Sequence, residues 1–221
     1  MKLLSKLLEH QSIAIEKLSK IKIGALYMEQ GTGKTRTALE LINLRLENNK
    51  VDKVLWLCPC SVKSEIVKEL NKHIGDDYSN TIFVYGIESL SSSIRLNSLL
   101  LRLVNQCKTY LVIDESNLVK NPSAMRTKNI QRLSELCQYK LILNGTPVSK
   151  NEADLFSQWY ILDWRILGYK SFWSFAANHL EYDDYGRIRK TLNVDYLSKK
   201  IAPYTYQVKK SDCLSLPTKH Y

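Results

Sequence analysis

The chain has 221 residues, of which 44% are hydrophobic, so it is long enough for one large α/β domain or for one domain with an appendage. It has no apolar stretch near the roughly 18 residues of a membrane span, and the start of the chain lacks the apolar core and cleavage site of a signal peptide. The net charge of +10 is concentrated near the C-terminal end. We therefore expect neither a membrane protein nor a secreted one.

The number and spacing of the cysteines also indicate an intracellular protein. The five cysteines are an odd number and have no zinc-ligand spacing; they are residues 58, 60, 107, 137 and 213. Cys58 and Cys60 could form a redox or metal pair, but their place beside a predicted strand end favours a structural role. We therefore expect a reduced, intracellular protein, in the cytoplasm of a bacterium or virus-infected cell or in the nucleus of a eukaryote.

Strands and helices are predicted to alternate along the first 150 residues. Apolar runs predict buried strands at 23–28, 54–58, 81–85, 109–114 and 140–143. Helical spacing of apolar residues predicts helices at 3–21, 36–46, 62–73, 94–104 and 123–137. The prediction of the first helix is based on an apolar stripe formed by Leu4, Leu7, Leu8 and Ile15. Such alternation produces a mostly parallel sheet with helices on both faces.

The pattern changes after about residue 150. Helices rich in Trp and Phe are predicted at 152–162 and 172–179, with a turn between short strands at 182–187. A short helix at 194–201 and a short strand at 205–208 follow. We therefore predict a core over residues 1–150 and a small helical and short-strand extension, rich in basic residues, over 151–221.

A glycine-rich loop follows the first predicted strand, where residues 29–35 read Glu-Gln-Gly-Thr-Gly-Lys-Thr. Gly31 and Gly33 can adopt positive φ and let N–H groups converge on phosphate oxygens. The next helix turns its partly positive N-terminus toward the same anion. Lys34 is expected to reach the terminal phosphates, and Thr35 to offer its hydroxyl to Mg²⁺. The predicted ATP ligands in this loop are Gln30, Gly31, Thr32, Gly33, Lys34 and Thr35.

A second motif, Asp114-Glu115, ends an apolar run 80 positions after Lys34. Buried parallel strands consist of such runs, and ligands of open α/β sheets bind where the strands end. Asp114 is expected to hold Mg²⁺, and Glu115 to orient or deprotonate the attacking water. A solvated acidic turn is the alternative interpretation.

The C-terminal region is basic. Residues 185–221 contain eight Lys or Arg against two acids, so +6 of the net charge lies there, and tyrosines 196, 204 and 206 are interleaved. This composition suits a nucleic-acid backbone, although a solvated surface explains it equally well. Lys209 and Lys210 are the two lysines that we assign to nucleic acid.

The motifs occur in an order that resembles the first RecA-like lobe of a Swi/Snf-type ATPase, a branch of the superfamily-two helicases. The resemblance covers nearly the whole chain. It rests on the segments 7–18, 29–35, 56–61, 114–126, 143–147, 151–156, 201–204, 208–212 and 216–221, and more weakly on 85–89. The implied fold is a RecA-like P-loop domain.

The resemblance also implies roles for single residues. Gln11 would read the adenine edge, whereas by itself it would be an exposed helix glutamine. Ser61 would meet a nucleic-acid phosphate, or would only cap the next helix. Gly145 and Thr146 would relay between the nucleotide site and the hinge.

The chain departs from the family pattern in two places. Met28 stands where the loop usually has Gly, which we interpret as a mark of the helicase type. Ser116 and Asn117 stand where the family commonly has Ala-His. Because that histidine often links the nucleotide site to the next motif, we expect the departure to bear on the coupling of hydrolysis to DNA.

The family places ATP between two lobes, and nothing in this chain resembles the later motifs. We therefore expect a piece of a longer enzyme, or a lobe that a partner protein completes. The resemblance implies a DNA-dependent ATPase that uses ATP and Mg²⁺, moves on duplex DNA and is weakly active without its second lobe. A nucleotide- or DNA-binding module without turnover is the main alternative. Another P-loop enzyme, such as a kinase, would leave Gly145-Thr146-Pro147 and the basic tail unexplained.

Overall fold

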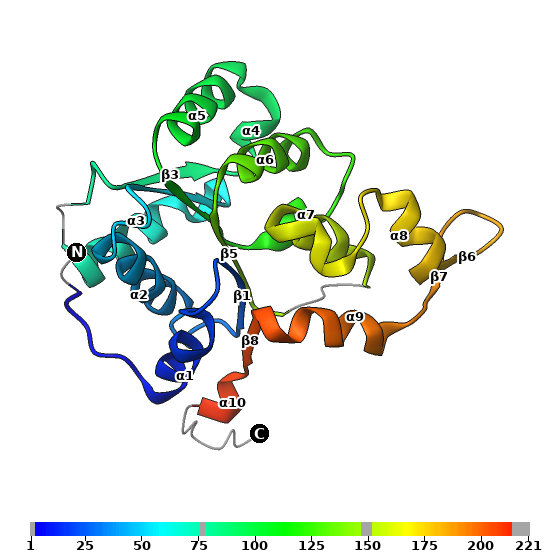
Figure 1. The fold of residues 1–221 in the computed structure, drawn as a ribbon, viewed down its shortest axis with the longest axis horizontal. Helices are drawn as coiled ribbons and strands as arrows, with labels where there is room; N and C mark the ends of the chain where they lie inside the picture. The colour runs from blue at the N-terminus through cyan, green and yellow to red at the C-terminus, as the bar shows by residue number, and fades with distance from the viewer. Residues whose placement is uncertain (1–2, 76–77, 147–151, 214–221) are drawn as a thin grey trace.

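The computed structural model describes residues 3–75, 78–146 and 152–213. Its centre is a sheet of six parallel strands in the order β3-β2-β4-β5-β1-β8 (Figure 1). The strands are β1 (Ile23–Met28), β2 (Lys53–Cys58), β3 (Ile82–Gly86), β4 (Thr109–Ile113), β5 (Tyr139–Asn144) and β8 (Thr205–Val208). The predicted parallel α/β sheet is confirmed.

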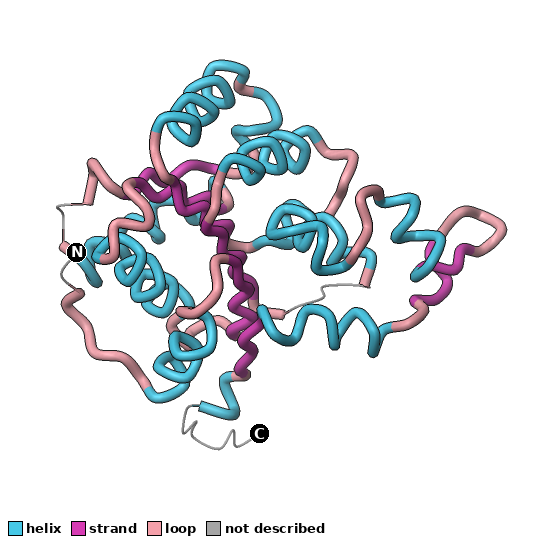
Figure 2. Tube along the Cα trace, in the orientation of Figure 1, coloured by secondary structure: helices cyan, strands magenta, loops and turns pink. Residues whose placement is uncertain are grey.

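Helices cover both faces of the sheet, as Figure 2 shows with the strands seen nearly edge-on. One face packs against α1 (Glu9–Leu18), α2 (Lys34–Glu47) and α3 (Lys63–Ile74). The other face has α4 (Ser89–Ser92), α5 (Ile94–Gln106), α6 (Met125–Leu136), α7 (Ala153–Leu167), α8 (Phe172–His179) and α9 (Val194–Ile201). Successive strand residues serve opposite faces: Tyr27 lies in one core and Leu26 in the other. Two buried faces explain why the strands read as continuous apolar runs.

The N-terminal segment differs from the prediction. A helix over 3–21 is wrong, because only Glu9–Leu18 is helical. The backbone N–H of Leu4 instead donates to the carbonyl of His73 at 2.8 Å, so the segment runs beside the end of α3. Of the stripe that suggested a longer helix, Leu4 and Leu8 are 58% and 49% exposed, whereas Ile15 packs against the core.

The chain beyond residue 152 adds to the same sheet and core. Strand β8 pairs in parallel with β1, and α7 buries Trp159 completely. The hairpin of β6 (Leu180–Tyr182) and β7 (Ile188–Thr191) lies with α8 at the far right of Figure 1. The predicted elements at 172–179, 194–201 and 205–208 have the bounds expected. The division of the chain at residue 150 stays a prediction, and so does its functional meaning.

Among the described residues, the longest helices are α7, α2 and α5, and each contributes buried side chains to one of the two cores. Within those ranges, no helix combines the length and the apolar character needed to cross a bilayer.

Candidate functional site

The carboxyl ends of the parallel strands form the candidate site. A cleft of about 480 Å³ lies there; its lining residues are Glu29, Gln30, Lys34, Glu115, Asn144, Gly145, Thr146, Gln207, Val208 and Lys209. They come from the glycine loop after β1, the acidic pair after β4, the turn after β5 and the end of β8. Ligands of open α/β sheets bind at this edge. The fold therefore brings three separate sequence motifs into one cleft.

The glycine loop has the backbone that the sequence predicts. Gly31 and Gly33 both have φ of +85°, a conformation that residues with a side chain rarely adopt. Inside the turn, the N–H and hydroxyl of Thr32 donate to the Glu29 carbonyl at 3.2 and 2.7 Å. Helix α2 begins at Lys34, and the N–H groups of a first helical turn have no partner within the helix. The loop and the helix N-terminus together form an anion-binding feature.

Helix α1 contacts the glycine loop through two side chains. The Nε2 atoms of His10 and Gln11 lie 2.8 and 3.2 Å from the Thr32 carbonyl, and Gln11 Oε1 accepts from the Leu8 N–H at 3.0 Å. Both side chains are buried. The adenine role of Gln11 stays a prediction; here its amide links α1 to the loop. Sequence analysis did not single out His10, although a polar pair on the buried face of α1 was the available signal.

The acidic pair occupies unusual environments. Asp114 is 6% exposed, and its Oδ1 accepts from the Glu115 N–H at 2.9 Å. Burial raises the pKa of Asp114 to about 6; the charge of Glu115 adds to the rise and that of Lys34 opposes it. Glu115 itself has φ of +48°. A left-handed non-glycine residue costs about 1–2 kcal/mol, and such strain clusters at functional sites.

These residues also fit a magnesium ion. The buried Thr35 hydroxyl donates to the carboxylate of Glu69, which reaches across from α3. Mg²⁺ prefers such hard oxygen ligands and keeps several waters and phosphate oxygens. Within the described residues no three His, Cys, Asp or Glu side chains group to hold a metal. Sequence analysis did not foresee Glu69, which lies 34 positions from Thr35.

Replacing Asp114 by Asn is expected to stabilise the metal-free protein at neutral pH. The pKa of Asp114 is higher in the folded chain than its usual 3.8, so folding is favoured below that value and the gain is lost as the pH rises through about 6. The shift corresponds to about 2–3 kcal/mol, which Asp114→Asn would recover at pH 8 and not at pH 4. Urea unfolding in EDTA at the two pH values measures this. An equal change in unfolding free energy at both pH values would contradict the raised pKa of Asp114.

The turn after β4 connects to α7 through Ser116. Its buried hydroxyl donates to Gln158 Oε1, and Gln158 Nε2 donates to the Asp154 carbonyl at 2.8 Å. The buried Oδ1 of Asn117 has no hydrogen-bond partner among the described residues. The contact between this turn and α7 is therefore made by Ser116, the first residue of the Ser116-Asn117 departure from the family pattern.

The turn after β5 lies at the mouth of the cleft. Gly145 N–H donates to Asn144 Oδ1 at 2.8 Å, and Thr146 is exposed beside it. The relay role of Gly145 and Thr146 stays a prediction. The rest of that motif, Pro147, and the segment predicted to follow from Asn151 begin outside the described residues.

Ser61 lies in a short 3₁₀ turn (Cys60–Val62) after β2 and is exposed. Val62 stands at the N-cap of α3, without a side-chain capping bond, so the helix-cap role of Ser61 is wrong. The turn intervenes between strand and helix, and the carboxylate of Glu88 accepts from the Cys60 N–H at 2.8 Å. Contact of Ser61 with nucleic acid stays a prediction.

Cys58 ends β2 as a buried residue, and Cys60 is an exposed residue of the following turn. All five cysteines are free. Within the described ranges, Cys58 and Cys60 do not belong to any group of side chains that could hold a metal. The placement agrees with the structural role that their strand-end position favours.

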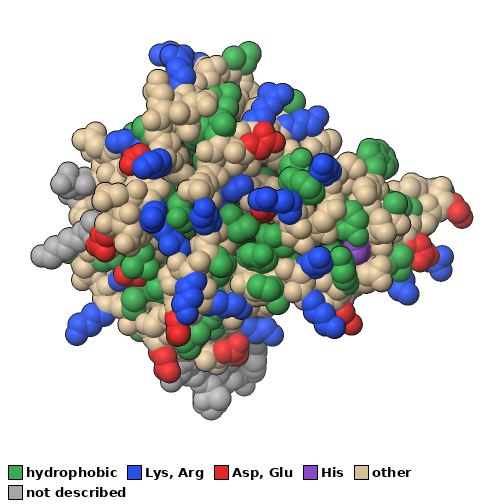
Figure 3. Space-filling view, in the orientation of Figure 1, with side chains coloured by type: hydrophobic (Ala, Val, Ile, Leu, Met, Phe, Trp, Pro, Cys, Tyr) green, Lys and Arg blue, Asp and Glu red, His purple; other side chains and the backbone are tan. Residues whose placement is uncertain are grey.

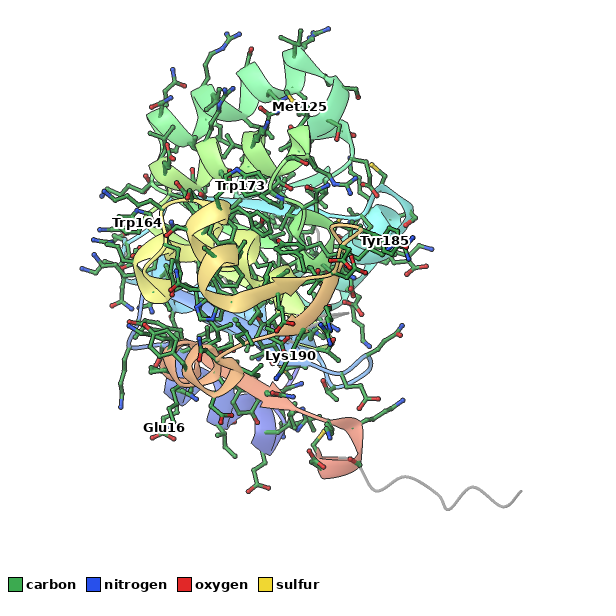
Figure 4. All side chains as sticks on the ribbon, turned by 90° about the vertical axis from the view of Figure 1, so that its right-hand side faces the viewer. Glu16, Met125, Trp164, Trp173, Tyr185 and Lys190 are labelled. Carbon is green, nitrogen blue, oxygen red and sulfur yellow. The ribbon has the colours of Figure 1, made fainter. Side chains whose placement is uncertain are left out.

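The basic residues of the extension are not one uniform surface. Lys209 lines the cleft, and the backbone N–H of Lys210 donates to Glu29 at 2.7 Å, so both lie at the glycine loop. Figure 3 shows Lys and Arg side chains of the whole chain spread over the visible face. Figure 4 looks onto the hairpin end, where Trp173 and Tyr185 are 80% and 85% exposed and Lys190 lies nearby on β7. The tail motif at 216–221 lies outside the described residues.

Comparison with known proteins gives a consistent picture. The model of the SNF2-related domain matches residues 79–220, and that of the type III restriction enzyme res subunit matches residues 4–61. A Caenorhabditis elegans protein named SWI/SNF-related matrix-associated actin-dependent regulator of chromatin subfamily A-like protein 1 homolog is 26% identical over 69% of this chain and 23% of its own length. TATA-binding protein-associated factor mot1 of Schizosaccharomyces pombe is 30% identical over 50% of this chain and 6% of its own length.

Two solved structures from Sulfolobus solfataricus have the same fold. The SWI2/SNF2 ATPase core domain aligns with 98% of this chain at a TM-score of 0.75, and the core in complex with dsDNA aligns with 94% at 0.73; both are 22% identical. The chain spans 47% and 45% of those cores, respectively, and under a quarter of the curated relatives. Since the SNF2-related model covers more than half of the chain, this protein belongs to the SNF2-related family and has the architecture of its N-terminal RecA-like lobe.

Proposed function

We propose that this chain is the ATP-binding lobe of a DNA-dependent ATPase that translocates on duplex DNA. The observation that carries the proposal is the meeting of Lys34 and Glu115 in one cleft, with Asp114 close enough to both for their charges to act on its pKa. A phosphate-binding loop beside a buried metal-binding carboxylate and a strained second carboxylate is the arrangement that nucleotide hydrolysis needs.

The residues divide the work as follows. The glycine loop and the N-terminus of α2 hold the phosphates, and Lys34 offsets their charge. Thr35 and Asp114 hold Mg²⁺, which supplies positive charge for the transferred phosphoryl group. Burial keeps Asp114 poorly solvated, so a divalent cation is a favourable partner for it. Glu115 orients the attacking water and accepts its proton.

The site is completed by a second RecA-like lobe, in the same polypeptide or from a partner protein. Arginines that act on the transition state from another element contribute roughly 10³ to 10⁵ in rate in related enzymes. The comparison supports this, because the chain aligns with less than half of each solved SWI2/SNF2 core. The lobe alone therefore turns over little ATP.

Duplex DNA is the proposed track. One solved neighbour is described as a complex with dsDNA, and the chain has a net charge of +10. Contacts to phosphates, with Ser61 among the candidates, would make the affinity fall steeply with salt. Such a substrate places the protein in the nucleus of a eukaryote, or in the cytoplasm of a bacterium or virus-infected cell.

ATP hydrolysis with and without duplex DNA tests the proposal. We expect the isolated chain to bind ATP and to hydrolyse it barely above background. With its second lobe, supplied in the longer protein or by a partner, we expect DNA-stimulated turnover that is faster by roughly 10³-fold or more. Robust DNA-stimulated turnover by the isolated monomer would refute the need for a second lobe.

The binding-module alternative has its own outcome. If hydrolysis is absent even with the second lobe, while the chain still binds DNA, the motifs form a scaffold without turnover. The variant Glu115→Gln serves as the inactive reference in both assays.

A further inference from the structure

The segment after β8 is tied to the glycine loop. The short helix α10 (Lys210–Cys213) continues from β8 at its carboxyl end (Figure 1). Lys210 N–H donates to Glu29 Oε2 at 2.7 Å, and Glu29 N–H donates to the Val208 carbonyl at 3.2 Å. Glu29 opens the loop and lies 181 positions from Lys210. The two bonds fix the end of β8 against the start of the loop.

The side chain of Lys210 lies on the loop itself. Its Cε and Nζ atoms are each 3.6 Å from the position that a Cβ on Gly31 would occupy. The residue is half-buried, and no ion pair among the described residues includes it. Glu29 accepts from the backbone N–H of Lys210, and none of these ion pairs joins its carboxylate to the Lys210 ammonium. A half-buried cation without a counter-ion favours binding of an anion beside it.

Resting on the nucleotide binding proposed above, we propose that Lys210 is a second phosphate-binding lysine. It contacts a phosphate oxygen of the nucleotide that the glycine loop holds. Lys34 reaches the phosphates from the first turn of α2, whereas Lys210 reaches them from the segment after β8. Lys209, which lines the cleft with Lys34, adds positive charge.

This arrangement has a consequence for regulation. Glu29 positions Lys210 through the backbone, and the nucleotide engages its side chain. Phosphate occupancy of the loop is thereby linked to the position of the segment that leaves the sheet after β8. The two lysines at 209 and 210 act on the nucleotide in this proposal, in place of the nucleic-acid contact that the sequence suggested.

Phosphate binding by neutral variants of Lys210 tests the proposal. The probes are a fluorescent ATP analogue and inorganic tripolyphosphate, the second because it lacks a base and a sugar. Loss of a charge-assisted hydrogen bond should weaken both by about tenfold or more in Lys210→Met, which keeps the aliphatic stem. Lys210→Arg should retain most of the affinity. Lys199→Met makes the same charge change on the exposed side of α9 and should bind as wild type does.

The outcomes separate this proposal from the one it rests on. If Lys210→Met binds tripolyphosphate as tightly as Lys199→Met, while Lys34→Ala does not bind, the role of Lys210 is refuted and nucleotide binding stands. If wild type binds neither probe, nucleotide binding itself fails. Duplex DNA is a third probe. If Lys210→Met binds the two phosphate probes as wild type does but binds duplex DNA more weakly, the lysine belongs to a nucleic-acid surface and its role at the nucleotide is refuted. Lys210→Gln repeats the comparison if the Met variant is unstable.

Discussion

The variant Glu115→Gln is expected to hydrolyse ATP roughly 10²- to 10⁴-fold more slowly than wild type while binding it with similar affinity. Glutamine keeps the size of the side chain and one oxygen that can orient water, but it cannot accept a proton. Glu115 lines the cleft with Lys34 and is held at φ of +48° by the turn after β4. Single-turnover hydrolysis, in the assembly that shows DNA-stimulated turnover, measures the effect, and fluorescent ATP measures the affinity.

A matched control lies on α3. Glu65→Gln makes the same chemical change at an exposed position that does not line the cleft, and it should leave the rate unchanged. A Glu115→Gln rate close to that of Glu65→Gln would show that another group activates the water. A parallel loss of affinity in Glu115→Gln would instead indicate that the carboxylate acts in binding.

Gly33→Ala is expected to cost about 2–5 kcal/mol of unfolding free energy. The left-handed backbone at φ of +85° accounts for about 1–2 kcal/mol of this for an L residue. The new Cβ would also lie 2.1 Å from Gln11 Nε2, so the buried amide must move and its bond to the Thr32 carbonyl is lost. Overpacking and a lost buried bond add about 1–3 kcal/mol. Urea unfolding measures the total.

Gly168→Ala separates the two causes. Gly168 ends α7 at φ of +88°, and apart from its two chain neighbours no atom of the described residues lies within 4 Å of the position of its Cβ. This variant should therefore lose only about 1–2 kcal/mol. If the two glycine variants lose the same free energy, the contact of α1 with the loop does not matter. In a Gln11→Ala background the additional cost at Gly33 should shrink.

Local patterns predicted the sheet and the loop well. The strand at 23–28 and the helix at 194–201 have the expected bounds because the first is a continuous apolar run and the second has the apolar spacing of an amphipathic helix. The helix at 3–21 failed for the same physical reason, since periodicity reports an apolar stripe and not whether a partner surface exists. Leu4 and Leu8 stay exposed, and only residues 9–18 are helical.

Single site residues show the same limit. Ser61 follows a strand and precedes a helix, which is where caps occur, but a 3₁₀ turn shifts the N-cap to Val62. Lys209 and Lys210 belong to a basic stretch of sequence, and charge patterning alone does not say which surface such residues face. Their position depends on β8 adding to the sheet beside β1.

The sequence by itself determined the succession of strands and helices along the chain and the positive φ of the glycine loop after the first strand. These features depend on neighbours within a few residues, so the sequence contains the whole signal. Only the tertiary structure decided that Glu69 contacts Thr35 and that Lys210 lies on the loop, across 34 and 181 positions respectively. The first contact arises because α2 and α3 pack on the same face of the sheet, and the second because β8 pairs in parallel with β1, so that their carboxyl ends meet at one edge.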